Sequence, residues 1–232
     1  MRPKIIFLDL EGTLVRIPEM TSRSSVAQSA WTTLAKLLGP DCLAAEEETK
    51  AKWEAKGYFN YLEWMEDTIR IHQKFGLNES IFTELVSSIE ETPGIREAAN
   101  LFHSWGSKIA IITGGFKAIA QKAQLAMRAH HAFAGCEYYF DHSGKLIHWN
   151  LLPSDYEGKA DFMRLLIREY GVTTADCVFV GDGVNDTFLA KEVGVSVAFN
   201  AQAALKQVTT YVVDQPQGQD NFLAVAELIA RH

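Results

Sequence analysis

Hydrophobic residues are spaced in two different patterns along the chain. Short unbroken apolar runs at 5–8, 109–112 and 177–180 are too brief for helices, and we expect buried strands there. From about 21 to 89 the apolar residues instead recur at helical spacing, with no strand pattern among them. The pattern therefore predicts a strand-containing core that is interrupted by a helical module.

The helical module is expected to contain four helices. Residues at its boundaries supply stop and start signals, such as Gly39 after the first helix and Asn60 before the third. The expected helices run from a cap at Ser24 or Ser25 to 38, from 41 to 56, from 60 to 75 and from 79 to 89. We assign residues 15–89 to this module and residues 1–14 and 90–232 to the core domain.

Strand and helix patterns alternate after a turn at 92–94. Such alternation predicts an α/β fold, with a Rossmann-like, mostly parallel sheet sandwiched by helices. The expected elements are a helix ending near 105, a strand at 108–113, a helix at 116–129, a small β-hairpin at 138–149, a helix at 157–170, strands at 177–180, 195–199 and 211–213, and a closing helix at 221–230.

Polar residues occupy the ends of three expected strands, at Asp9, Thr113 and Asp182. A buried carboxylate is destabilising unless a cation or hydrogen-bond donors compensate it. Because the carboxyl ends of parallel strands meet at one edge of the sheet, where ligands bind, we expect these side chains to lie close together. An aspartate at a strand end also caps turns and helices, and a single position does not separate the two roles.

The segment Gly181-Asp182-Gly183-Val184-Asn185-Asp186 places two acids around a turn that leads into a helix. Together with Asp9 they make three carboxylates able to converge, a donor set that suits a hard cation such as Mg²⁺. In isolation the segment also fits an ordinary turn with a helix cap. Three carboxylates at one edge would repel one another without a cation, so the combination favours Mg²⁺.

A phosphate group is the expected partner of such a cation. Thr113-Gly114-Gly115 offers a hydroxyl and backbone N–H groups at a predicted helix N-terminus, where anions are favoured. Lys159, near the start of the helix at 157–170, would add a positive charge. A lysine is usually a solvated surface residue, and only its place in this series suggests a role.

Composition narrows the class of ligand. The 232 residues, 47% of them hydrophobic, are enough for one sizeable core plus an insertion. Their net charge of −7 argues against a nucleic-acid surface. No apolar run approaches membrane-spanning length, and no signal-like segment opens the sequence, so we expect a cytoplasmic protein without membrane contact. Cys42, Cys136 and Cys177 lack CxxC spacing and are expected to be reduced thiols. Both a monomer and a homodimer remain open.

Four motifs in order resemble those of the haloacid dehalogenase superfamily of phosphotransferases, over nearly the whole chain. The motifs are Asp9-x-Glu11-x-Thr13, Thr113-Gly114, Lys159 and Gly181-Asp182-x-x-Asn185-Asp186. The helical insertion after the first motif resembles the C1 cap of that superfamily. Thr113-Gly-Gly-Phe116 and the last motif most resemble the phosphoserine phosphatase branch.

This resemblance implies a two-step mechanism. Asp9 would attack phosphorus to give an aspartyl-phosphate, which water then hydrolyses. Glu11 would protonate the leaving oxygen and later deprotonate the water. Most of the superfamily has aspartate at position 11, whereas enolase-phosphatases and a phosphoserine:homoserine phosphotransferase also carry glutamate there. The extra methylene moves the proton-transfer group and requires local accommodation.

The resemblance also implies binding roles. Thr113, Gly114 and Lys159 would hold the phosphoryl oxygens, and Asn185 would touch phosphate or substrate. Mg²⁺ would be held by Asp9, Asp182 and the backbone carbonyl of Glu11, with Asp186 ligating it or steadying its water shell.

Substrate selection is expected in the cap. By resemblance, Glu19 would hold an ammonium group, whereas Arg70 is either a carboxylate ligand or a solvated helix residue. Phe59, with Tyr61 and Trp64, would line the pocket or pack the cap against the core. We interpret Trp31 and Trp53 as packing residues. The histidines His72, His103, His130 and His131 lack metal-ligand spacing and are interpreted as ordinary surface or packing residues.

The sequence therefore predicts a Mg²⁺-dependent phosphomonoesterase that acts on a small, polar, phosphoserine-like metabolite. One alternative is a phosphotransferase that passes the phosphoryl group to an acceptor alcohol. The other is a non-catalytic, phosphate-responsive binding module, since receiver domains place Asp, Thr and Lys on a similar sheet. Thr13, the pair Asp182 and Asp186, and the cap argue against this second alternative.

Overall fold

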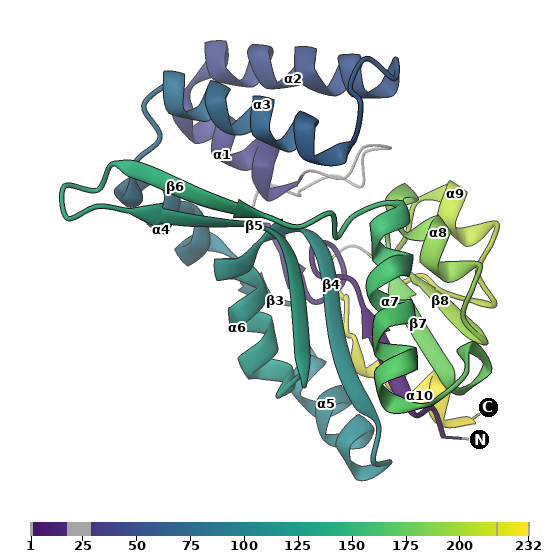
Figure 1. The fold of residues 1–232 in the computed structure, drawn as a ribbon. Helices are drawn as coiled ribbons and strands as arrows, with labels where there is room; N and C mark the ends of the chain where they lie inside the picture. Colours follow the sequence, from purple (N-terminus) through teal and green to yellow (C-terminus); the bar gives the residue numbers. More distant parts are fainter. Residues whose placement is uncertain (1, 18–28, 217, 232) are drawn as a thin grey trace.

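A seven-stranded sheet forms the centre of the molecule (Figure 1). The computed structural model describes residues 2–17, 29–216 and 218–231. The strand order is β6-β5-β4-β1-β7-β8-β9, and all neighbours are parallel except β6, which is antiparallel to β5. The strands are β1 (Ile5–Leu8), β4 (Lys108–Phe116), β5 (His131–Phe140), β6 (Leu146–Leu151), β7 (Cys177–Gly181), β8 (Val195–Phe199) and β9 (Tyr211–Val213). The predicted α/β fold is confirmed.

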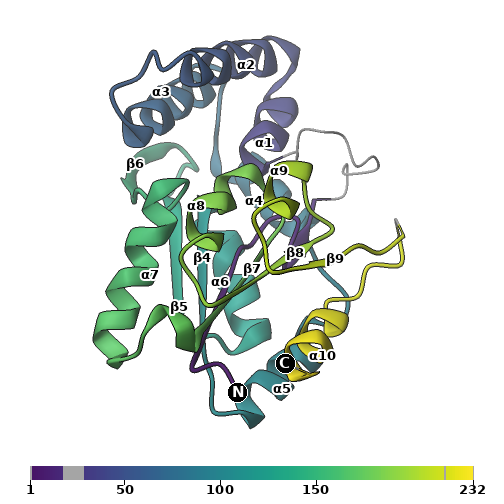
Figure 2. The same ribbon diagram turned by 90° about the vertical axis from the view of Figure 1, so that its right-hand side faces the viewer.

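Helices cover both faces of the sheet, and Figure 2 shows α7 on one side with α5 and α10 on the other. Alternate residues of β1 pack on opposite faces: Ile6 and Leu8 contribute to the core under α5, α6 and α10, and Ile5 and Phe7 to the core under α7, α8 and α9. The helices are α5 (Ile95–Ser104), α6 (Lys117–Met127), α7 (Glu157–Tyr170), α8 (Thr187–Ala190), α9 (Ala203–Lys206) and α10 (Leu223–Arg231). In the described ranges, no helix combines the length and apolar character that crossing a membrane requires.

The register of the three central strands aligns their carboxyl ends. β1 lies between β4 and β7, and Leu8 is level with Ile111 on one side and Val180 on the other. The N–H of Asp9 donates to the carbonyl of Val180 (2.9 Å), which continues the pairing one residue beyond β1. The polar residues that follow these strands therefore leave the sheet at the same edge.

Four further helices form the insertion, and α1, α2 and α3 lie over this edge of the sheet (Figure 1). They are α1 (Ala30–Leu38), α2 (Pro40–Glu54), α3 (Tyr61–Lys74) and α4 (Glu79–Ser88). The side chain of Asn60 accepts a hydrogen bond from the N–H of Glu63, so the predicted start of the third helix is confirmed. The first helix begins later than predicted and is capped by Ser29; the expected caps Ser24 and Ser25 lie outside the described residues.

A two-stranded ribbon connects the insertion to the core. β2 (Val15–Arg16) and β3 (Glu90–Glu91) pair antiparallel where the chain leaves the sheet and where it returns. The sequence did not predict this ribbon, because two residues are too few to show a strand period.

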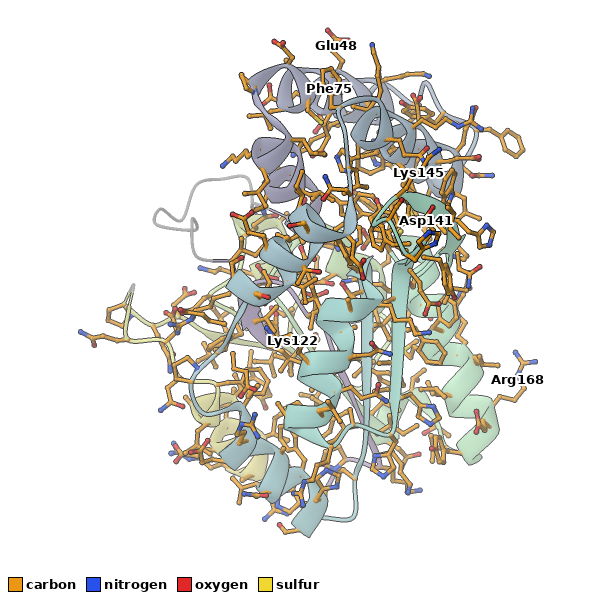
Figure 3. The ribbon with its side chains drawn as sticks, turned by 90° about the vertical axis from the view of Figure 1, so that its left-hand side faces the viewer. Glu48, Phe75, Lys122, Asp141, Lys145 and Arg168 are labelled. Atoms are coloured by element: carbon orange, nitrogen blue, oxygen red, sulfur yellow. The ribbon has the colours of Figure 1, made fainter. Side chains whose placement is uncertain are left out.

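The hairpin of β5 and β6 is longer than predicted and forms one edge of the main sheet. β5 begins at His131, well before the expected start at 138, because its first half pairs in parallel with β4. Figure 3 shows Lys145 and Asp141 of the hairpin below the helical insertion, on which Glu48 is labelled at the top. The N–H of Glu79 donates to the carbonyl of Gly144 (2.9 Å), so the hairpin turn is attached to the start of α4.

Candidate active site

Lys159 is fully buried in the first turn of α7 and contacts two carboxylates. Its Nζ lies 2.5 Å from Asp9 Oδ1 and 2.6 Å from Asp186 Oδ1. Burial alone would lower the pKa of Lys159, but the carboxylates of Asp186, Asp9 and Asp155 raise it well above its ordinary value. Lys159 is therefore a permanent positive charge at the end of β1.

Asp9, Asp182 and Asp186 form a buried acidic cluster. One carboxylate oxygen from each lies within 4.8 Å of the others. Burial raises the pKa of Asp182 well above its usual range, and the charges of Asp9 and Asp186 raise it further. When all three carboxylates are ionised, the single charge of Lys159, which contacts Asp9 and Asp186, leaves an excess negative charge. An all-oxygen donor set with this excess charge fits a hard divalent cation.

The turn after β7 fixes the shape of this cluster. Oδ2 of Asp186 accepts hydrogen bonds from the backbone N–H groups of Asp182 and Gly183, both at 3.0 Å. A Cβ added at Gly181 would lie 2.3 Å from the same oxygen, so this position has no room for a side chain. Asp186 thus orients the loop with one oxygen and contacts Lys159 with the other.

Glu11 extends from the loop after β1 toward the cap. Its Oε2 accepts a hydrogen bond from the N–H of Ala30 at the start of α1 (2.9 Å), whereas its buried Oε1 has no hydrogen-bond partner in the described part of the chain. Burial raises the pKa of Glu11 to about 7, against the lowering effect of the Ala30 N–H. A Cβ added at Gly115 would lie 2.3 Å from Oε1, so the glycine provides the space that the longer acid needs.

Residues 113–116 belong to β4, which corrects the expectation of a helix N-terminus at the Thr-Gly-Gly turn. The strand continues through Phe116 because it resumes pairing with β5 after a register shift, and α6 begins at Lys117. Oγ1 of Thr113 accepts a hydrogen bond from the N–H of Gly115 (3.0 Å), and the carbonyl of Gly114 accepts one from Nε1 of Trp31 (3.1 Å). Thr113 and Gly114 nevertheless face the same pocket as Asp9 and Glu11.

Asp155 connects Asn185 to Lys159. Nδ2 of Asn185 donates to Asp155 Oδ1 (2.6 Å), and this oxygen lies 3.9 Å from Nζ of Lys159. A Cβ added at Gly114 would lie 2.4 Å from Asp155 Oδ2, so Asp155 closes the side of the pocket. Every predicted catalytic, phosphate-binding and metal residue is therefore within one connected constellation.

A pocket of about 330 Å³ extends from these residues to the cap. Its cap half is lined mainly by aromatic and acidic residues, among them Trp31, Tyr61, Trp64, Tyr156, Glu46 and Glu54. Tyr61 and Trp64 thus line the pocket, as one of the two sequence interpretations had it. Trp31, expected only to pack, contacts Phe116 (ring centroids 4.4 Å apart) and lines the pocket as well.

The other expected substrate residues are not brought to the pocket. Phe59 is 93% exposed and is not among the lining residues. Arg70 is exposed and forms an ion pair with Glu66 one helical turn earlier (2.8 Å), which is the solvated alternative. Glu19 lies outside the described residues.

Comparison with known protein families shows to which family this chain belongs. A family model described as haloacid dehalogenase-like hydrolase matches residues 3–194. The chain belongs to this family. A phosphoserine phosphatase of Archaeoglobus fulgidus is 26% identical over 233 aligned positions, which cover 97% of this chain but only 60% of that protein. A phosphoserine phosphatase of Methanocaldococcus jannaschii is 23% identical over 92% of this chain and 93% of its own length.

Solved structures agree with this haloacid dehalogenase-like fold. A phosphoserine phosphatase described as a phospho-aspartyl intermediate analogue has a TM-score of 0.72 and 21% identity, with 98% of this chain and 99% of that chain covered. The predicted resemblance to the haloacid dehalogenase superfamily, and to its phosphoserine phosphatase branch, is confirmed.

Several pocket residues of this haloacid dehalogenase-like hydrolase were missed by sequence reasoning, among them Glu46, Glu54, Asp155 and Tyr156. Asp155 and Tyr156 precede α7, and Glu46 lies on α2 with its Oε2 2.7 Å from Nε2 of the fully buried His72. Asp155 stands one helical turn before Lys159, a spacing that the sequence displays. Glu46 and His72 show no such signal, because they meet only through the packing of α2 on α3.

Proposed function

We propose that this chain is a phosphomonoesterase that hydrolyses a small phosphate ester, with Asp9 as the nucleophile. The observation that supports this most is the position of Asp9: it is buried, contacts Lys159, and shares one pocket with Glu11, whose pKa is raised to about 7 by burial. A carboxylate held in this way beside a fixed ammonium is suited to attack an anionic phosphoryl group.

Asp9 and Glu11 carry the covalent steps. An oxygen of Asp9 attacks phosphorus, the bond from phosphorus to the leaving alcohol oxygen breaks, and Glu11 gives that oxygen its proton. Water then attacks the aspartyl-phosphate and gives its proton to Glu11, which restores both side chains and releases phosphate. A pKa of about 7 makes both protonation states of Glu11 accessible near neutral pH.

Thr113, Gly114, Lys159 and Asn185 bind the phosphoryl oxygens in this proposal. Lys159 supplies a charge that does not depend on pH in the ordinary range, since its pKa is raised well above the usual value by its carboxylate neighbours once burial is offset. Asp155 positions Asn185 through their 2.6 Å hydrogen bond.

Mg²⁺ is the cofactor that we propose for the acidic cluster. Asp9, Asp182 and Asp186 would hold it, together with the backbone carbonyl of Glu11. When bound, it supplies the positive charge that offsets the repulsion between these carboxylates and a phosphate dianion.

The test is phosphate release from a panel of small phosphomonoesters, measured with Mg²⁺ and with EDTA. We expect Asp9→Asn to lower kcat by at least about 1,000-fold, because it removes the nucleophile. Asp161→Asn is the matched control, since that aspartate is exposed on α7 and its carboxylate pairs with Arg164 (2.6 Å).

Two results would contradict the proposal: turnover that persists in Asp9→Asn, or no turnover of any ester by a folded protein that binds Mg²⁺. A new phosphoester formed when an acceptor alcohol is added would instead identify a phosphotransferase, which shares every step up to the aspartyl-phosphate.

A further inference from the structure

The cap half of the pocket has an aromatic wall. The rings of Tyr61 and Trp64 are nearly perpendicular, with centroids 5.8 Å apart, and the ring of Tyr156 lies 5.9 Å from that of Tyr61. Trp31 lines the same space from α1, and Trp53 stacks on Trp64 at 5.0 Å. These rings form one aromatic cluster, of which Trp31, Tyr61, Trp64 and Tyr156 line the pocket, and aromatic rings attract organic cations.

Carboxylates outnumber cations in this half of the pocket. Glu46 and Glu54 of α2 line it, with Lys50 between them in the sequence, and Asp155 lines the pocket from the loop before α7. Within the ranges that the structure describes, no arginine is among the lining residues. Among these described lining residues, a carboxylate on the ligand finds no arginine as a bidentate partner, whereas the acids favour an ammonium group and aromatic rings can add to that attraction.

Hydrogen bonds to neighbouring residues hold the side chains of this wall in place. Nε1 of Trp64 donates to Oγ1 of Thr49 (3.0 Å), and Nε1 of Trp31 donates to the carbonyl of Gly114 (3.1 Å). Glu46 is fixed by the fully buried His72 at 2.7 Å. Rings and acids that are fixed before a ligand arrives lose little conformational entropy on binding.

We propose that the pocket selects phosphomonoesters whose alcohol part carries an organic ammonium group and no carboxylate, that is, phosphorylated amino alcohols, including quaternary ones. This inference rests on the proposed phosphatase function and names its substrate class. The phosphate occupies the end near Lys159, and the ammonium group lies against Tyr61, Trp64 and Tyr156 with Glu46 and Glu54 nearby. A pocket of about 330 Å³ is sufficient for an ester of this size.

Matched pairs of phosphate esters separate the effect of a charged group on the ligand from the effect of ligand size. Phosphocholine and its neutral isostere 3,3-dimethylbutyl phosphate differ only in the ammonium charge, and phosphoethanolamine and O-phosphoserine differ only in the carboxylate. We expect kcat/KM to be about tenfold or more higher for the first member of each pair.

Variants of the wall test which residues make this distinction. Tyr61→Leu and Glu54→Gln are each expected to reduce the ratio of kcat/KM for phosphocholine over 3,3-dimethylbutyl phosphate by about threefold to tenfold. Because a ratio within one variant cancels a general loss of activity, partial misfolding does not imitate this result. Phe59→Leu, an aromatic substitution on the same cap at a 93% exposed residue, is the matched control and should leave the ratio unchanged.

Binding of choline, followed by quenching of tryptophan fluorescence, keeps this inference distinct from the proposed function. Choline that quenches while no ester is hydrolysed would overturn the phosphatase proposal and support the cation pocket. Turnover of neutral esters with charge ratios near one, or a preference for O-phosphoserine, would overturn the inference and leave the phosphatase intact. Neither turnover nor quenching would overturn both.

Discussion

The two ends of the pocket are lined by different kinds of side chain. At the sheet edge, Asp9, Lys159 and Asp186 are buried ions in direct contact, positioned by strand register and by a turn that tolerates no added side chain. At the cap, Tyr61 and Trp64 form a wall of rings whose contacts are dispersive and less directional. The first end depends on the position of single atoms, so one substitution there should abolish the chemistry. A single substitution at the second end should change activity only partly.

Removal of the buried cation should have the largest effect. Lys159→Met leaves the carboxylates of Asp9 and Asp186 buried beside each other, and we expect a loss of about 3–5 kcal/mol in the free energy of unfolding without Mg²⁺. We also expect kcat to fall by about 1,000-fold with Mg²⁺ present. Urea unfolding and steady-state kinetics measure the two effects.

Lys206→Ala is the control for this substitution. It removes an ion pair with Asp214 at the surface (2.7 Å), where the expected loss is below about 1 kcal/mol. Equal losses in the two variants would mean that burial of Lys159 does not matter to the sheet-edge cluster.

A methyl group at position 115 should disturb the acid rather than the nucleophile. Gly115→Ala places a Cβ 2.3 Å from Oε1 of Glu11, so the carboxyl group must move, and we expect kcat to fall by about 100-fold. Adding Glu11→Asp shortens the acid and should restore at least about tenfold of this loss. A Gly115→Ala enzyme with wild-type kcat would show that Glu11 has no fixed position in the reaction.

Mg²⁺ should act on stability as well as on activity. Burial and the charges of Asp9 and Asp186 raise the pKa of Asp182, so its ionised form opposes folding. Saturating Mg²⁺ should therefore raise Tm by about 5 °C or more. Asp182→Asn should raise the metal-free Tm and remove the response to Mg²⁺, while Asp161→Asn should retain it. A metal-free Tm that falls in Asp182→Asn would contradict the repulsion that we infer.

Arg70→Ala should have the smallest effect. Its guanidinium pairs with Glu66 at the surface, so we expect KM for the preferred ester to change by less than about twofold. A tenfold increase in KM would place Arg70 in the substrate site. The cap end of the pocket would then contain a functional charge as well as the aromatic wall.

The sheet-edge half of the site was predictable from the sequence, and the cap half largely was not. Short apolar runs fixed the strands, and parallel strands bring Asp9, Thr113 and Asp182 to one edge whatever surrounds them. Which face of a cap helix points at the sheet depends on tertiary packing, which periodicity does not encode. For this reason the sequence suggested Arg70, which is exposed and pairs with Glu66, and missed Glu46 on α2. Phe59 before α3 and the pair Asp155 and Tyr156 before α7 lie in loops, whose conformation leaves no periodic signal in the sequence.

The start of α1 has a consequence for the order of events in a turnover. The N–H of Ala30 holds Glu11, and the indole of Trp31 holds the carbonyl of Gly114, so adjacent residues of one cap helix contact both the acid and the phosphate-side strand. Any movement that lifts this helix breaks both hydrogen bonds together. In the proposed reaction, α1 would therefore act as an interlock: lifting it to exchange ligands would free the carboxyl group of Glu11, and returning it would fix that group again.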